Sequence, residues 1–165
     1  MKKIIIATLG ILATTTPAFA GSGNQSTATG TATATIVAPI VLTHPASASL
    51  NFGRFTTGTG GSVTVTAAGV GSVGSDVTFV PGSTNSADQF TVAGDASRSF
   101  SITTTGGNVT SGATNLAFTT TPSAGTASLS STGTASFTVG GTLTVTGTAP
   151  AGSYTGSYSA TVTYN

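Results

Sequence analysis

The sequence contains no cysteine, and only 4% of its 165 residues carry a charge. Without cysteine no disulfide can form, so buried apolar surface and hydrogen bonds must hold the fold together. A single domain of this length can bury enough apolar surface to do so. Ser and Thr hydroxyls become the main polar surface. Such a surface suits a protein that packs against copies of itself, or simply an exported protein with an economical composition.

Basic residues are too scarce for a nucleic-acid or anionic-lipid surface. Beyond the first twenty residues the only cations are Arg54 and Arg98, and the anions are Asp76, Asp88 and Asp95. Two isolated arginines cannot make the basic patch that binding to a polyanion requires. We therefore expect no nucleic-acid partner.

Long hydrophobic runs are missing as well. Two lysines precede one short apolar run, residues 4–13. Small residues suited to a cleavage site follow it and end at Ala20. This pattern predicts a signal peptide over residues 1–20, removed before Gly21, because the run is too short to span a bilayer. We expect an exported protein that passes through the periplasm to the cell surface, with no membrane insertion after cleavage.

Helical periodicity is absent, whereas alternation of apolar and polar residues recurs along the chain. Gly- and Pro-containing turn signals separate the alternating segments, and Thr and Val suit a pleated surface. Many short strands without helices predict an all-β antiparallel sandwich. The expected strands cover residues 27–42, 47–55, 62–67, 76–80, 89–92, 97–104, 115–121, 126–130, 134–146 with a break at Gly140-Gly141, and 154–164.

The N-terminal segment 27–42 alternates without a register slip over sixteen residues. Odd positions from 27 to 35 are Thr, and one face is apolar. The length predicts about 50 Å of strand, whereas a strand in a small sandwich is nearer 17–20 Å. A second subunit could bury the excess; alternatively, Pro39 separates a loose tail from an ordinary first strand. The candidate partner-binding residues on the apolar face are Ala28, Gly30, Ala32, Ala34 and Ile36.

The C-terminal segment also places apolar residues on one face, alternating with Ser and Thr. A strand at the end of a chain can accept a partner along its edge, or it can be a final core strand without a partner. The candidate residues for this edge strand are Gly152, Tyr154, Tyr158, Ala160, Val162 and Tyr164.

Together the two ends resemble the chaperone–usher pilin subunits, on three features: terminal alternation, the penultimate Tyr164, and Gly152 fourteenth from the end. The resemblance implies an immunoglobulin-like (pilin-like) sandwich that lacks one strand. A periplasmic chaperone would fill the gap first. The N-terminal extension of the next subunit would then replace the chaperone strand, at an outer-membrane usher.

More of the chain resembles a bacterial family catalogued as a domain of unknown function, which has pilin-like and spore-coat-U-like relatives. One difference stands out, because pilins of this kind often carry a cysteine pair and this chain has none. The matching stretches are 32–40, 50–53, 90–94 with 100–102, 137–143 and 151–156.

Residues for catalysis are not grouped in the sequence. The only histidine, His44, lies in a turn before Pro45 and is expected to be solvated. The three Asp residues lie within two positions of a Gly or Ser in expected loops, where Asp favours turns, and their spacing does not suit calcium. Arg54 and Arg98 are expected at the surface or paired with an Asp. We therefore expect no enzyme, no cofactor and no metal site.

These observations predict a signal peptide (1–20), an N-terminal extension that is a candidate donor strand (21–35), and a sandwich domain (36–165). The leading hypothesis is a structural subunit of a surface fimbria that binds copies of itself or related subunits by donor-strand exchange. The alternative is a self-contained exported surface-binding or coat module, adhesin-like, whose N-terminal segment folds back into its own sheet.

Overall fold

The computed structural model describes residues 23–25 and 27–165, so the predicted signal peptide lies outside the described residues. The chain divides into two units, Met1–Thr35 and Ile36–Asn165. The described residues of the first unit are exposed and belong to no strand.

The second unit contains thirteen strands, and no helix occurs among the described residues. Every strand pairing is antiparallel, which confirms the predicted all-β class. The strands are β1 (Val41–Thr43), β2 (Phe55–Thr56), β3 (Gly60–Val65), β4 (Gly71–Ser75), β5 (Thr78–Phe79), β6 (Asp88–Ala93), β7 (Ser99–Thr104), β8 (Gly107–Ser111), β9 (Thr114–Pro122), β10 (Thr126–Ser128), β11 (Thr134–Thr146), β12 (Thr155–Gly156) and β13 (Ala160–Tyr164).

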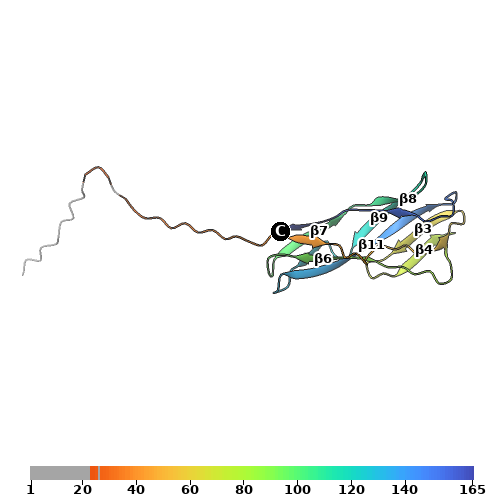
Figure 1. Ribbon diagram of the computed structural model, residues 1–165, viewed down its shortest axis with the longest axis horizontal. Helices are drawn as coiled ribbons and strands as arrows, with labels where there is room; N and C mark the ends of the chain where they lie inside the picture. Colours follow the sequence, from red (N-terminus) through yellow and green to blue (C-terminus); the bar gives the residue numbers. More distant parts are fainter. Residues whose placement is uncertain (1–22, 26) are drawn as a thin grey trace, which may run out of the picture. The chain divides into compact units, whose positions relative to one another are not determined.

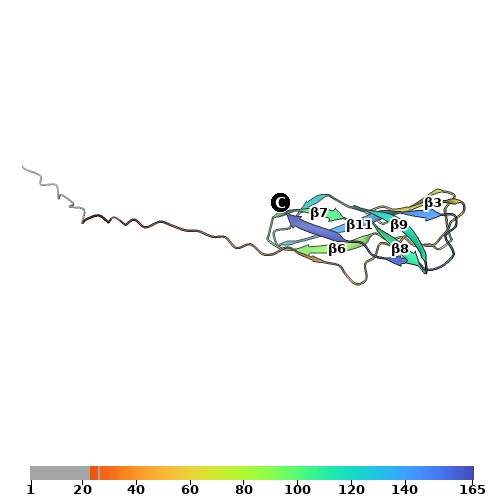
Figure 2. The same ribbon diagram turned by 90° about the horizontal axis from the view of Figure 1, so that it is seen from above.

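The strands form a sandwich of one large sheet and two small ones (Figures 1 and 2). The large sheet has eight strands in the order β1-β6-β11-β9-β8-β12, with β3 and β4 attached beside β11. The small sheets have the orders β10-β7-β13 and β2-β5. Two adjoining core clusters fill the space between the layers, and each contains residues of the large sheet and of one small sheet.

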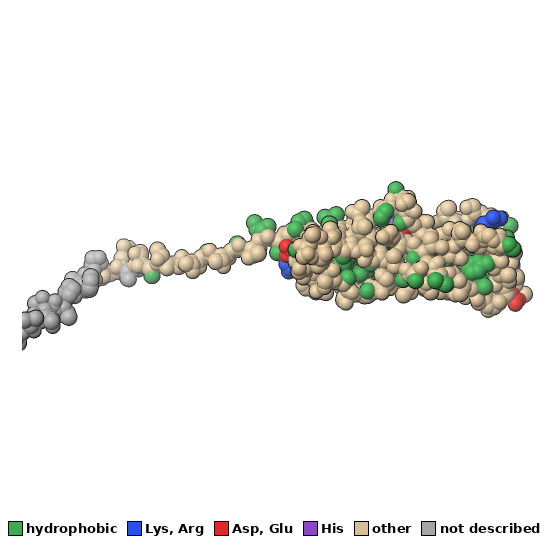
Figure 3. Space-filling view, turned by 90° about the horizontal axis from the view of Figure 1, so that it is seen from below, with side chains coloured by type: hydrophobic (Ala, Val, Ile, Leu, Met, Phe, Trp, Pro, Cys, Tyr) green, Lys and Arg blue, Asp and Glu red, His purple; other side chains and the backbone are tan. Residues whose placement is uncertain are grey.

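The alternation of apolar and polar residues along each strand determines which side chains are buried in the core. In β6, for example, Phe90 and Val92 are buried while Gln89 and Thr91 point outward. On β7, Phe100 is fully buried and packs in the same cluster as Phe90. Apolar side chains therefore meet between the sheets, and Thr and Ser cover the outer faces. Figure 3 shows such a face, on which charged side chains are few and hydrophobic atoms lie in separate groups.

The long strand β11 is the centre of the large sheet. Along one edge it pairs first with β6, over Thr134–Val139, and then with β3, over Gly141–Thr146, while β9 pairs with its other edge. The predicted break at Gly140-Gly141 is therefore wrong, because the strand is continuous and only its partner changes. Gly140 lies at this change, where a Cβ atom would overlap the Val65 carbonyl oxygen and lie 2.6 Å from the Ala67 nitrogen.

Four other strand predictions differ from the structure. The expected strand 47–55 forms only a bridge between Asn51 and Ser86 and the first residue of β2. Residues 27–40 form no strand in the single chain, and Pro39 has no N–H to donate. β4 and β8 were not predicted, because two of the five residues of β4 are Gly and β8 begins in an expected turn. The C-terminal segment forms β12 and β13 in two different sheets rather than one strand.

We predict that Gly140→Ala destabilises the protein by about 1–3 kcal/mol, because the added methyl group must push the backbone of residues 65–67 away from β11. Gly125→Ala is the matched control, since a Cβ atom there meets nothing within 4 Å. Urea unfolding of both variants measures the difference. Equal stability of the two variants would contradict the close approach at Gly140.

Candidate strand-binding groove

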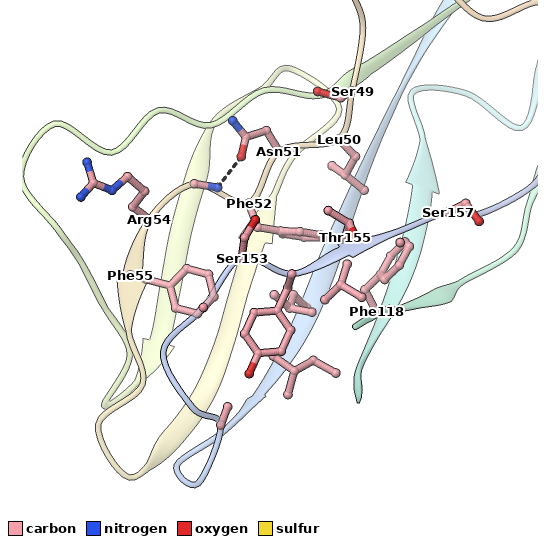
Figure 4. Close-up of a pocket in the computed structure, with 18 of the residues that line it drawn as sticks. Ser49, Leu50, Asn51, Phe52, Arg54, Phe55, Phe118, Ser153, Thr155 and Ser157 are labelled. Carbon is pink, nitrogen blue, oxygen red and sulfur yellow. Dashed lines mark hydrogen bonds between the residues drawn. The ribbon is translucent and has the colours of Figure 1, made fainter. Parts of the chain in front are cut away.

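A groove of about 1200 Å³ lies on the sandwich (Figure 4). Two continuous chain segments line it, and we call them the first wall (residues 49–57) and the second wall (residues 149–158). Buried side chains of the first core cluster form its floor, and Phe52 and Phe118 lie there with ring centroids 5.9 Å apart.

The first wall uses its backbone hydrogen bonds on one side only. Asn51 exchanges two backbone hydrogen bonds with Ser86, and the Val80 N–H donates to the Arg54 carbonyl over 3.0 Å. β2 of the same wall pairs with β5. All of these partners lie between residues 78 and 86, away from the second wall.

The second wall is also paired on one side. Its strand β12 pairs with β8, so that Thr155 faces Thr110 and Gly156 faces Val109. Across the described residues, no backbone hydrogen bond joins the first wall to the second. Two chain segments, each with a two-residue strand (β2 or β12), therefore border an apolar floor without a backbone hydrogen bond between them. This combination can accept an extended chain, whose backbone pairs with an edge and whose alternate side chains enter the floor. In the first wall, side chains already bind the Phe52 carbonyl and the Gly53 and Arg54 N–H groups.

A polar cluster lies at one end of the groove, and we call it the Asp88 clamp. The Asp88 side chain is 4% exposed, and it is the only buried charged residue in the described part of the chain. Its carboxylate binds His44 Nε2 at 2.7 Å and accepts a hydrogen bond from the Tyr158 hydroxyl at 2.8 Å. The Gln89 N–H donates to the same carboxylate.

The clamp corrects two expectations from the sequence. His44 is not simply solvated, because it binds Asp88 and its ring centroid lies 4.9 Å from that of Phe90. Asp88 is not a turn former, since it begins β6 and points inward. Residues 44, 88 and 158 are far apart in the chain, so no local pattern could have shown that they meet.

Tyr158 is held in its protonated form. Burial raises the pKa of its hydroxyl well above the usual value of 10.0, and the hydrogen bond to Asp88 and the negative charge of that carboxylate raise it further. The hydroxyl therefore remains a donor to Asp88 at neutral pH.

The structure divides the predicted C-terminal residues into two groups. Gly152, Tyr154 and Tyr158 line the groove. Ala160, Val162 and Tyr164 lie beyond the clamp on β13 and pack against the second core cluster. Sequence alternation alone could not reveal that the segment changes sheets at 157–159, between these two groups.

Tyr164 connects strand β13 to the segment just before β1. Its hydroxyl donates to the Ala38 carbonyl over 3.0 Å and accepts from the Asp95 N–H over 2.6 Å. The Arg98 guanidinium group lies over the Tyr164 ring, with its carbon 5.0 Å from the ring centre. Its Nη1 atom forms an ion pair with Asp95 at 3.6 Å. Arg54, in contrast, points away from the groove (Figure 4).

The predicted donor residues are exposed. Ala28, Gly30, Ala32 and Ala34 belong to no strand, and Ile36 is 97% exposed. In the described residues there is no cluster of three or more potential metal ligands. The same part of the chain contains no helix that is long and apolar enough to cross a membrane.

Fold and groove together define an all-β sandwich domain with two unpaired strand edges. Residues 41–164 match the family model described as Domain of unknown function (DUF4402), and the chain belongs to that family. The expected resemblance to a family of unknown function is confirmed to this extent. No curated protein and no solved structure matches the chain.

We predict that Tyr158→Phe lowers the free energy of unfolding by about 1–3 kcal/mol, because the buried Asp88 carboxylate loses a donor. Tyr154→Phe is the control, since the Tyr154 hydroxyl donates to the Pro150 carbonyl at the surface. Denaturant unfolding compares the two variants. A loss in Tyr158→Phe no larger than in Tyr154→Phe would show that the clamp does not stabilise the fold.

The raised pKa of Tyr158 also predicts a dependence on alkaline pH. Above the usual tyrosine pKa of 10.0, the unfolded chain loses this proton while the folded chain keeps it. The stability contributed by the group is therefore complete below pH 10 and falls as the pH rises further. Unfolding between pH 8 and 11 should show a steeper decline in the natural chain than in Tyr158→Phe, and parallel declines would refute the assignment.

Proposed function

We propose that the protein is a structural subunit of a bacterial surface fimbria, in which the N-terminal segment of one copy occupies the groove of the next. The groove carries this proposal, because two unpaired strand edges border an apolar floor. A strand placed there would satisfy both edges and cover the floor, as in β-strand addition.

The length of the candidate donor agrees with the groove. The walls span residues 49–57 and 149–158, and the candidate donor residues within the alternating segment 27–42 span residues 28–36. Nine residues of strand extend about 30 Å. Both walls and the donor therefore have nearly the same length.

The pattern of the donor agrees with a floor on one side and solvent on the other. Its even positions are the small Ala28, Gly30, Ala32 and Ala34, followed by the large Ile36. Its odd positions are Thr. The small side chains would bring the donor backbone close to the floor residues, and the burial of Ile36, exposed in the single chain, favours binding.

The same arrangement explains a fibre rather than a closed dimer. The donor and the groove are different surfaces of one chain, so each copy offers one of each. Contacts of this head-to-tail kind produce open filaments when the rotation does not close.

The same proposal includes assembly partners and a location at the cell surface. The apolar floor and unpaired edges would promote aggregation during transport, so a periplasmic chaperone and an outer-membrane usher are the proposed assembly partners. The mature subunit would be located at the cell surface. The alternative, a self-contained adhesin-like or coat module, expects residues 27–35 in their own sheet, and in the structure these residues are exposed and in no strand.

Peptide binding to the mature chain (residues 21–165) tests the proposal. We expect a labelled peptide of residues 27–36 to bind and to raise the melting temperature. Ala32→Asp in the peptide should weaken binding by at least about tenfold, because it buries a carboxylate. Thr31→Asp, its outward-facing neighbour, is the matched control and should change affinity little.

Fluorescence anisotropy measures the affinity, and thermal unfolding measures the stabilisation. Absence of binding, or equal loss in the two substituted peptides, would count against strand donation and favour the self-contained module.

A further inference from the structure

The groove is closed at one end by the Asp88 clamp. His44 follows β1 and leads into the first wall, whereas Tyr158 ends the second wall. Both side chains bind the one buried carboxylate, at 2.7 and 2.8 Å. The two walls are therefore connected here through three side chains.

Beyond the clamp, the gap between the two sides of the sandwich is filled. Ile40 and Leu42 from one side and Val162 and Tyr164 from the other pack against the second core cluster. The Tyr164 hydroxyl adds a second connection, to the Ala38 carbonyl. None of these four residues lines the groove.

No described side chain connects the walls at the opposite end, where the chain just beyond each wall meets in the Gly60–Thr146 pair of β3 and β11. It is bordered by Thr56 and Thr57 from the first wall and by Ala149 and Pro150 from the second. Within the described residues no side-chain hydrogen bond or ion pair joins the walls at this end. A strand can enter here without breaking a polar contact.

We propose that the groove is a blind acceptor, in which the Asp88 clamp sets both the direction and the depth of the bound strand. This inference rests on the proposed function. The donor is joined to its own subunit after Ile36, and that subunit must stay outside the groove. Ile36 therefore lies at the open end and Ala28 next to the clamp.

Direction and register follow from this placement. The second wall runs from residue 149 at the open end to Tyr158 at the clamp, so the donor is antiparallel to it and parallel to the first wall. Residues before Ala28 find the way closed by the clamp and leave the groove. The acceptor thus takes nine residues, and a longer donor gains no further contact.

Disulfide trapping tests the direction, because the chain has no cysteine of its own. Ser153 and Ser157 are exposed positions of the second wall (Figure 4). Ser157 is next in the chain to Tyr158 of the clamp, and Ser153 is four residues nearer the open end. Each is replaced by Cys in the mature chain. Peptides of residues 21–36 carry either Thr29→Cys or Thr33→Cys, both at outward-facing positions.

We expect Ser157→Cys to trap the Thr29→Cys peptide and Ser153→Cys to trap the Thr33→Cys peptide, each in preference to the opposite pairing by about tenfold or more, because partners in one antiparallel register lie equally far apart on the two strands. Preference for the opposite pairing would overturn the direction. Binding with no preference, or with no trapping, would overturn the blind acceptor while leaving strand donation intact. A peptide that does not bind at all would overturn both proposals.

A clamp variant tests the depth. In the mature chain carrying His44→Gln and Tyr158→Phe, the carboxylate no longer connects the walls through both partners. We expect trapping at Ser157→Cys to spread from Thr29→Cys to peptides with Thr31→Cys and Thr33→Cys, as the strand moves past the clamp. Circular dichroism confirms that the variant is folded. An unchanged preference for Thr29→Cys in a folded variant would overturn the role of the clamp as a stop.

Discussion

Unpaired backbone groups are the constraint on which the organisation of this molecule depends. Each wall of the groove is hydrogen-bonded on its outer side, and the edge facing the other wall has no backbone partner there. Buried or half-buried N–H and C=O groups without partners cost free energy. The sandwich is thus closed over the second core cluster, where side chains fill the gap, and open over the first.

The first core cluster shows why the open part still folds. Val63, Val65 and Val145 are at most 3% exposed, and they lie on strands that pair through β11. None of these three residues lines the groove, so their burial within the large sheet does not depend on what covers it.

The sequence predicted some features of this arrangement well and others not at all. Period-two alternation identified β6, β7, β9 and β11 because these strands have one buried and one exposed face. β4 and β8 each contain a single apolar side chain, a Val, so their pairing depends on neighbouring strands rather than on local pattern. The Asp88 clamp could not be predicted, because it joins three residues through tertiary contacts. The change of sheet after Tyr158 is equally invisible in an alternating segment.

The connection between Tyr164 and Ala38 has a mechanical consequence. Any tension on the N-terminal segment reaches the sandwich at Ala38, just before β1. β1 passes the force to β6 in the large sheet through three residue pairs, and the Tyr164 hydroxyl passes it to β13 and thence to β7 in the small sheet. A pull on the segment is therefore shared by both layers of the sandwich.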